Sequence, residues 1–165
     1  MQQLWSPWRL DYVTGSKADV GCVFCTEQTL PETESLIVHR GAQCYVILNR
    51  YPYNPGHLMV LPNRHVPALA DLSTEELHEL ADLTKLAETA LVNAYRPQGI
   101  NVGINLGLSA GAGIREHLHV HLVPRWNGDT NFMSVVGNVR VLPEDLSETA
   151  KRLRPIFERL AKNDV

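Results

Sequence analysis

The chain has 165 residues, which suits one folded domain of ordinary size. Its composition, 44% hydrophobic and 20% charged, is typical of globular proteins and argues against wholesale disorder. The net charge is −3, and no run of Lys and Arg is present that could follow a phosphate backbone. Duplex nucleic acid is therefore a poor partner, whereas a small phosphate ligand needs only a local site.

Signals for export and for membrane insertion are missing from the sequence. No basic segment precedes an apolar one, and no apolar stretch approaches the ~18–20 residues that a membrane helix needs. Three cysteines are an odd number, which disfavours a disulfide framework and favours metal binding or simple burial. We therefore expect a cytoplasmic protein that does not enter a membrane.

The first half of the chain begins with an irregular arm, residues 1–34, that carries two cysteines. Residues 35–48 hold two β-rich runs on either side of Arg40 and Gly41, a pattern typical of a hairpin. Turn-forming residues then lead into residues 57–61, which we expect to form a short strand stopped by Pro62.

A long helix is predicted from Ser73 onward. Glu76 lies three residues after Ser73, which is the capping-box pattern. Arg96, Pro97 and Gly99 end the helix. An apolar stripe at helical spacing predicts the face that packs on the sheet: Leu77, Leu80, Leu83, Leu86, Ala87 and Leu91.

The second half of the chain alternates strands and loops before a last helix. Residues 100–105 alternate like a strand, and residues 106–113 form a glycine-rich loop. Residues 117–123 form another strand, closed by Pro124, which could pair with the first because the loop between them is short. A final helix is expected from about residue 145 to 162, with a kink at Pro155.

These elements together predict an α+β fold. An antiparallel sheet of about five strands would carry one long helix packed on it and a C-terminal helix. We expect one domain over residues 1–165, with its core at 35–133 and the C-terminal helix within 143–165.

The segment over residues 117–123, with the sequence HLHVHLV, is the most informative. Neighbouring side chains of a strand point to opposite faces, so His117, His119 and His121 share one face at intervals of roughly 6.5–7 Å. Such a row can bind a metal or act on a phosphate, because a neutral imidazole is a nucleophile near pH 7 and a protonated one donates hydrogen bonds. The alternative is a His-rich polar strand that faces solvent.

Two other segments are expected to converge on this histidine face. Asn49 ends one strand, and His57 begins the next. The glycine-rich loop that follows Asn105 allows backbone N–H groups to approach an anion closely, so it is a candidate phosphate cradle. By itself the loop could equally be an ordinary turn.

This combination resembles the histidine-triad (HIT) nucleotide hydrolases and transferases. The alternating histidines, the asparagine and glycine loop before them, Asn49, and the Pro55-Gly56-His57 step all look like that family. Residues 4–9 and 124–133 are similar to its diadenosine-tetraphosphate phosphorylase-like branch. The resemblance covers about residues 4–133, and it implies a HIT-like fold and a homodimer.

The resemblance also implies a role for each matching catalytic residue. His119 matches the nucleophile, which would attack the α-phosphorus of a nucleotide and form a nucleotidyl-histidine intermediate. His121 matches a histidine that contacts phosphate, and His57 matches one that supports the nucleophile. The nucleophile needs its second ring nitrogen held as N–H by an acceptor, for which we expect a backbone carbonyl.

The resemblance implies a nucleotide-binding set as well. Asn105 matches a contact to the α-phosphate and Asn49 a contact to the ribose. Ile47 and Met59 fall where apolar residues sandwich the base, although ordinary core packing is an equally good interpretation of both.

The glycine-rich loop departs from the family pattern at one point. Many members have a glutamine in this loop, and this chain has none there. A backbone N–H of Gly113 or Ile114 would have to replace that contact.

Cys22 and Cys25 have the C-x-x-C spacing that allows two thiolates to bind one tetrahedral metal. The spacing leaves the second ligand pair open, and a buried pair of free thiols is the alternative. The candidate ligands are His39, His65, His78 and the three histidines of the 117–123 strand. A redox role is weaker, because no thioredoxin-like context surrounds the pair. HIT proteins with this cysteine pair, and the similar hexose-phosphate uridylyltransferases, imply that His65 and His117 complete a structural Zn²⁺ site. His117 would then be unavailable to phosphate.

The leading functional hypothesis is a nucleotidyltransferase that acts on dinucleoside polyphosphates, with inorganic phosphate as a possible acceptor. A hydrolase of nucleoside phosphoramidates or polyphosphates that releases AMP is the alternative. A non-catalytic regulator that binds purine nucleotides is a third possibility. A zinc hydrolase with the three histidines as ligands is disfavoured, because residues at period two converge on one ion only if the strand bends.

Overall fold

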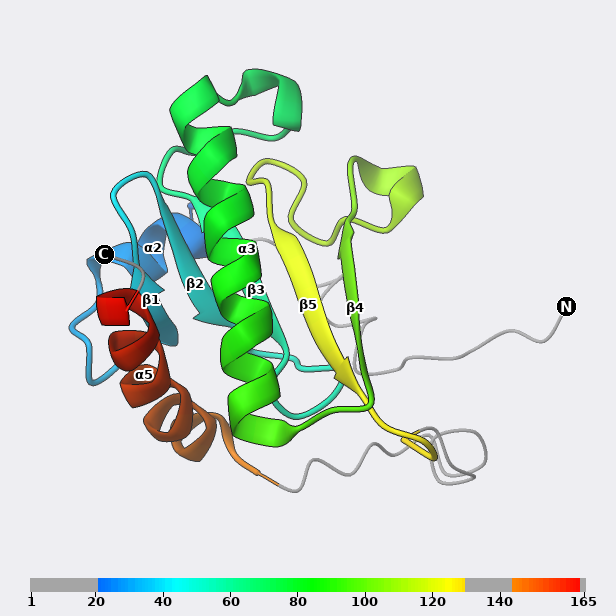
Figure 1. Ribbon diagram of the computed structural model, residues 1–165. Helices are drawn as coiled ribbons and strands as arrows, with labels where there is room; N and C mark the ends of the chain where they lie inside the picture. Colours follow the sequence, from blue (N-terminus) through cyan, green and yellow to red (C-terminus); the bar gives the residue numbers. More distant parts are fainter. Residues whose placement is uncertain (1–20, 130–143, 164–165) are drawn as a thin grey trace, which may run out of the picture.

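The computed structural model describes residues 21–129 and 144–163, and Figure 1 shows its elements. Five strands form one sheet in the order β1-β2-β3-β5-β4, and every neighbouring pair is antiparallel. The expected α+β fold with one long helix and a C-terminal helix is confirmed. The elements in chain order are α2 (Val23–Thr29), β1 (Ile37–Arg40), β2 (Cys44–Leu48), β3 (Leu58–Pro62), η1 (Leu69–Asp71), α3 (Thr74–Tyr95), β4 (Gly99–Ile104), η2 (Leu108–Ala110), β5 (Val120–Arg125) and α5 (Leu146–Asn163).

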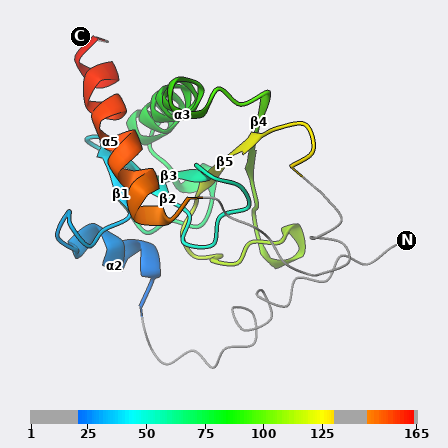
Figure 2. The same ribbon diagram turned by 90° about the horizontal axis from the view of Figure 1, so that it is seen from below.

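The two faces of the sheet bury different sets of side chains. On one face, residues such as Val46, Val60 and Val120 form the main core with α3 and α5. On the other face, Tyr45 and Met59 belong to a second cluster that packs against α2. Figure 2 shows α3 and α2 on opposite sides of the sheet. Successive side chains of each strand point to opposite faces, which produces this division. The functional site lies on the face that α2 covers.

Helix α3 begins with the predicted capping box. The Ser73 hydroxyl accepts from the Glu76 N–H at 3.2 Å, and the Glu76 carboxylate accepts from the Ser73 N–H at 2.7 Å. The expectation that Leu77 lies on the packed face is wrong, because its side chain is 45% exposed. Glu76 takes the inward position instead, since the Arg64 guanidinium binds its buried carboxylate at 2.6 Å.

The expectation of an irregular arm is wrong for α2, while residues 1–20 lie outside the described residues. A helix of seven residues is not stable by itself, so tertiary contacts must hold it. Phe24 is buried against the sheet, and the Tyr45 hydroxyl donates to the Phe24 carbonyl at 3.1 Å. These contacts come from a distant strand, so the arm sequence alone did not reveal the helix.

Several strand boundaries differ from the prediction, and β4 covers Gly99–Ile104 rather than 100–105. Strand β3 starts at Leu58, because His57 closes the preceding turn with its N–H on the Asn54 carbonyl, and it includes Pro62, which was expected to stop it. Strand β5 covers Val120–Arg125 rather than 117–123, since the Leu118 N–H donates to Val66 outside the sheet, at 2.7 Å. The strand also continues past Pro124, which lies opposite Ile100 of β4.

The remaining expectations concern the C-terminal helix and the membrane. Helix α5 forms over Leu146–Asn163, with Pro155 inside it, and its buried side chains join the main core, while the kink at Pro155 stays a prediction. No helix within residues 21–129 and 144–163 is long and apolar enough to cross a bilayer. The division of the chain into a single domain stays a prediction.

Candidate nucleotide-binding and metal sites

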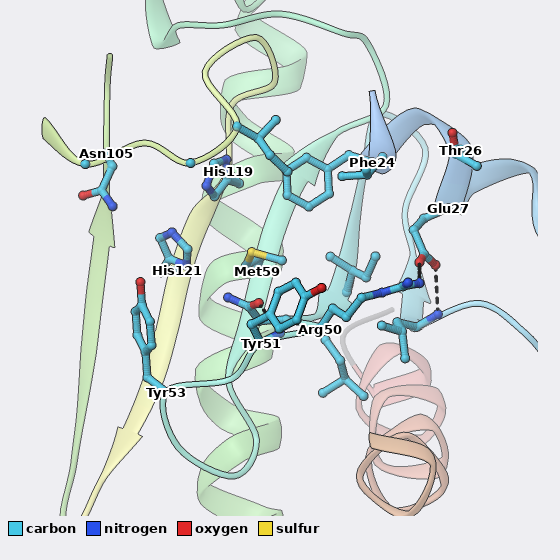
Figure 3. A pocket seen from close by; sticks show the side chains of 18 of the residues that line it. Phe24, Thr26, Glu27, Arg50, Tyr51, Tyr53, Met59, Asn105, His119 and His121 are labelled. Atoms are coloured by element: carbon cyan, nitrogen blue, oxygen red, sulfur yellow. Dashed lines mark hydrogen bonds and ion pairs between the residues drawn. The ribbon is translucent and has the colours of Figure 1, made fainter. Parts of the chain in front are cut away.

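A cavity of about 470 Å³ lies between the sheet and α2. Its floor is a row of side chains that follows the register across neighbouring strands: Ile47 lies opposite Met59, and Met59 lies opposite His121. Phe24 of α2 lines the cavity as well (Figure 3). Ile114, directly after the glycine-rich loop, also lines it. The cavity is therefore apolar over much of its lining and has histidines at one end.

Most of the predicted site residues meet in this cavity. Figure 3 shows His119, His121 and Asn105 grouped on one side of it. His57 does not line the cavity, because it is fully buried behind His121. The predicted residues that line the cavity are Ile47, Asn49, Met59, Asn105, Gly113, Ile114, His119 and His121.

The ring of His119 is held in one orientation by its own strand. Its Nδ1–H donates to the His117 carbonyl at 2.8 Å, which leaves the lone pair on Nε2. The side chain is 6% exposed, and its ring lies 5.2 Å from that of Phe24. Burial lowers the pKa of His119 below its usual value, although the bond to the His117 carbonyl opposes this shift. The ring is therefore a neutral, oriented imidazole at pH 7.

The ring of His121 is held through His57. The Tyr53 N–H donates to His57 Nδ1 at 3.1 Å, so His57 carries its proton on Nε2 and donates to His121 Nδ1 at 3.0 Å. A neutral His121 that accepts at Nδ1 must carry its own proton on Nε2. The ring centroids of His119 and His121 lie 4.8 Å apart. The lone pair on His119 Nε2 and the N–H of His121 are therefore on neighbouring rings.

The loop between β4 and β5 has the backbone that its glycines predict. Gly107 and Gly111 have φ of 81° and 89°, which side chains rarely allow. The Ala112 N–H donates back to the Gly107 carbonyl at 3.2 Å and folds the loop on itself. Gly113 and Ile114 are thereby brought to the cavity wall, next to the histidines.

Four potential metal ligands lie together at the start of α2. The ligand atoms of Cys22, Cys25, His65 and His117 are all within 4.8 Å of one another. His117 Nδ1 is 3.4 Å from Cys22 Sγ and 3.6 Å from Cys25 Sγ, and His65 Nδ1 is 3.4 Å from Cys25 Sγ. The other histidines that the spacing left open lie elsewhere: His39 stacks on Phe157, and His78 is exposed.

The geometry of these four residues fits a tetrahedral ion. Zn–S bonds of about 2.3 Å and Zn–N bonds of about 2.0 Å place tetrahedral S and N ligands about 3.5 Å apart. His117 Nε2 donates to the Pro62 carbonyl at 2.9 Å, which leaves Nδ1 unprotonated for a metal. Burial and the neighbouring Cys22 raise the pKa of the Cys25 thiol to about 11, so a cation is needed to stabilise the two thiolates.

Several residues of the cavity were not found by sequence reasoning. Arg50, Tyr51 and Tyr53 line it, and their position between Asn49 and His57 was a signal that could have found them. The wall contributed by α2 had no such signal, because that segment was expected to be irregular. The α2 residues that line the cavity are Val23, Phe24, Thr26 and Glu27.

Comparison with known proteins is consistent with this geometry. The family model described as "HIT domain" matches residues 31–128. A curated relative from Mycobacterium tuberculosis, named AP-4-A phosphorylase, is 45% identical over 167 residues, covering 96% of this chain and 86% of the relative. The bis(5'-nucleosyl)-tetraphosphatase (asymmetrical) of Schizosaccharomyces pombe is 33% identical over 95 residues, covering 58% of this chain and 52% of the relative.

Solved structures show the same fold. A zinc-bound histidine triad family protein from Mycobacterium smegmatis superposes with a TM-score of 0.68 at 28% identity, covering 87% of this chain and 97% of that one. A hypothetical histidine triad nucleotide-binding protein from Sulfolobus tokodaii has a TM-score of 0.65 at 29% identity, covering 86% and 93%.

Proposed function

Because this chain belongs to the HIT domain family, we propose that it is a nucleotidyltransferase that acts on dinucleoside polyphosphates through a covalent intermediate on His119. The observation that carries the proposal is the orientation of His119. Its Nδ1–H is bound to a backbone carbonyl, and the ring lines the cavity with its Nε2 lone pair available. The 45% identical AP-4-A phosphorylase supports the choice of substrate.

In the proposed reaction His119 Nε2 attacks the α-phosphorus, and the remaining nucleoside polyphosphate leaves as the P–N bond forms. His121 and Asn105 lie beside His119 and would donate to the phosphate oxygens, as would backbone N–H groups of Gly113 or Ile114. Such donors are worth most when they are already oriented, and the bond from His57 orients His121.

The nucleoside would occupy the rest of the cavity. Asn49 lies at the end of β2, where it would bind the ribose, and its Oδ1 already accepts from the Tyr51 N–H at 2.9 Å. Ile47 and Met59 provide a flat apolar floor for a purine base. This arrangement supports a purine nucleotide as the substrate class.

The second substrate decides between two versions of the reaction. With inorganic phosphate as acceptor, the intermediate yields ADP, which the AP-4-A phosphorylase relative supports. With water it yields AMP, from polyphosphates or phosphoramidates, which the tetraphosphatase relative supports. Product analysis with and without phosphate separates them: ADP that appears only with phosphate supports the first version, and AMP alone supports the second.

Loss of the nucleophile tests the intermediate itself. We expect His119→Ala to abolish covalent labelling by a radiolabelled adenylyl donor and to lower kcat on the order of 10³-fold or more, because no other group supplies the nucleophile. His78→Ala, on the exposed face of α3, is the control and should keep both. Wild-type protein that binds nucleotide but never becomes labelled would instead be a non-catalytic nucleotide-binding regulator.

We also propose that the Cys22, Cys25, His65 and His117 group holds a structural Zn²⁺. The donor set, the ligand distances and the bond from His117 to Pro62 support it, as does the zinc-bound relative of known structure. Among the residues that the structure describes, His117 is the only triad member in this group, so a zinc hydrolase with all three histidines as ligands is not supported.

The assembly and location of the protein are proposed on narrower grounds. Within residues 21–129 and 144–163, β4 pairs only with β5, and its Val102 is 53% exposed. An open strand edge with exposed apolar residues favours pairing with a second copy of the chain. We therefore propose a homodimer. Free thiols stay reduced most readily in a reducing compartment, and the described cysteines are all free, which supports the cytoplasm.

A further inference from the structure

The cavity has a second polar end, which the proposed chemistry does not use. Glu27 of α2 lies across the cavity from His121 and Asn105 (Figure 3). Its side chain is only 9% exposed, and the wall around it includes the apolar residues Leu30 and Leu36. A buried carboxylate is costly unless its oxygens are bonded, so its partners indicate what it can still bind.

The partners of Glu27 occupy its two oxygens unequally. Oε2 accepts from the Leu36 N–H at 3.1 Å and lies 3.4 Å from the Ser35 hydroxyl. Oε1 has Arg50 Nη2 at 2.9 Å, and Arg50 itself is 63% exposed at the cavity mouth. A carboxylate has about four acceptor positions. Within the described part of the chain, Oε1 therefore keeps one acceptor position for a ligand in the cavity.

The position of Glu27 relative to the histidines indicates which part of a nucleotide would reach it. With the α-phosphate beside His119, the base would lie over Ile47 and Met59 with its far edge directed toward α2. That edge of adenine carries a 6-amino group, which is a donor. The same position of a 6-oxo purine carries an acceptor, which a carboxylate repels.

Resting on the proposed function, we propose that Glu27 accepts a hydrogen bond from the 6-amino group of adenine and so makes the site selective for adenine nucleotides. Arg50 is a positioning residue in this scheme, because its guanidinium compensates the buried charge and holds Oε1 in place. Selectivity arises because a base without the amino group leaves the second acceptor position of Glu27 Oε1 unfilled in a site that excludes water.

The test is calorimetric binding of two nucleotides: AMP, and the 5'-monophosphate of purine riboside, which has hydrogen at position 6. Wild-type protein is expected to bind AMP about tenfold more tightly. In Glu27→Gln the amide oxygen can still accept from the buried Leu36 N–H, which turns its NH₂ group toward the cavity. The AMP preference should then fall below about twofold.

Glu76→Gln is the matched control. Glu76 also forms a buried ion pair with a half-exposed arginine, Arg64, with side-chain exposures of 4% and 56%, but it does not line the cavity. We expect this variant to keep the wild-type AMP preference. Loss of the preference in Glu76→Gln as well, or its survival in Glu27→Gln, would overturn the inference.

The wild-type measurement separates this inference from the proposed function, and it does not depend on the folding of any variant. If wild-type protein binds neither nucleotide, the proposed function fails. If it binds both equally well, the nucleotide site stands and the role of Glu27 is wrong.

Discussion

At the scale of single residues, the site depends on which nitrogen of each imidazole carries the proton. His119 is held by its bond to the His117 carbonyl, and His121 by the N–H of His57. In a freely rotating imidazole either ring nitrogen, Nδ1 or Nε2, could carry the proton. The contact to His119 therefore leaves a nitrogen that can attack phosphorus as a nucleophile. The contact to His121 leaves an N–H that can donate to a phosphate oxygen.

His57→Leu is expected to lower kcat about tenfold or more, because His121 loses the donor that fixes its proton on Nε2. The effect should fall on kcat more than on KM, since His57 does not line the cavity. Steady-state kinetics with a dinucleoside polyphosphate measure this split. His57→Gln keeps an amide that can accept from Tyr53 and donate to His121, and it should recover most of the activity. Wild-type kcat in the leucine variant would show that this contact is not used.

At the scale of elements, α5 is attached to the sheet by polar and aromatic contacts. The guanidinium of Arg154 donates to the carbonyls of Glu32, Ser35 and Ile37, at 2.8–3.3 Å. The ring of His39 on β1 stacks on Phe157 at 5.4 Å, with 15° between the planes. A titratable ring thus lies within the α5 contact.

This contact predicts a pH-dependent stability. Burial lowers the pKa of His39 below 6.5, and the opposing attraction of Glu79 on α3 is the weaker effect. With a folded-state pKa below the unfolded value, the unfolded chain binds protons first as the pH falls. The contribution of His39 is therefore complete above about pH 6.5 and is lost as the pH drops below it.

Urea unfolding at pH 7.5 and pH 5.5 measures the effect. Wild-type protein should lose more free energy of unfolding between these pH values than His39→Gln, which cannot titrate at this position. The other histidines are common to both proteins, so the difference between the two losses isolates His39. Equal losses would contradict the prediction.

The short helix α2 links the proposed metal site to the cavity. Its cysteines face His65 and His117, while Phe24 and Glu27 line the cavity from the same turns. A helix of seven residues depends on such external contacts. Metal binding and nucleotide binding should therefore support each other through α2.

Removal of metal by a chelator is expected to lower Tm by about 5 °C or more, to speed amide exchange in α2 and to weaken AMP binding. Differential scanning calorimetry, hydrogen exchange and calorimetric titration measure the three effects. The variant Cys25→Ala should already show them and should not respond to the chelator. Purified protein with far less than about one zinc per chain by elemental analysis would count against the site.

At the scale of the whole molecule, the sheet ends in an open edge. Strand β4 is its outermost strand, as Figure 1 shows, and β1 forms the other edge. Val102 on β4 and Leu106 and Leu108 after it are 53%, 45% and 70% exposed. Apolar exposure along a strand edge is a typical site of association.

Val102→Lys is expected to shift the proposed dimer to monomer, because a charge on the edge strand opposes pairing with a second copy. Light scattering after size-exclusion chromatography measures the mass. Leu77→Lys, at the exposed start of α3, is the control and should leave the mass unchanged. A monomeric wild-type protein would refute the proposed assembly.

Local sequence patterns predicted most of the fold because they depend on near neighbours. The alternation over residues 117–123 placed His117, His119 and His121 on one face, and the rings of His117 and His119 both contact Phe24 on the α2 side. The pair Ser73 and Glu76 located the start of α3 within one residue. The roles of the site residues remain predictions until kinetics test them.

By itself the sequence determined which side chains share a face and where the long helix begins, since both depend on contacts within a few residues. Only the tertiary structure decided what faces them. His117 meets Cys22 across 95 positions of sequence, a pairing that the family resemblance implied but that no local pattern shows, and Arg50 meets Glu27 across 23. Such distant pairs form only when the sheet and α2 pack together, so the wall that holds Glu27 has no signature in the sequence.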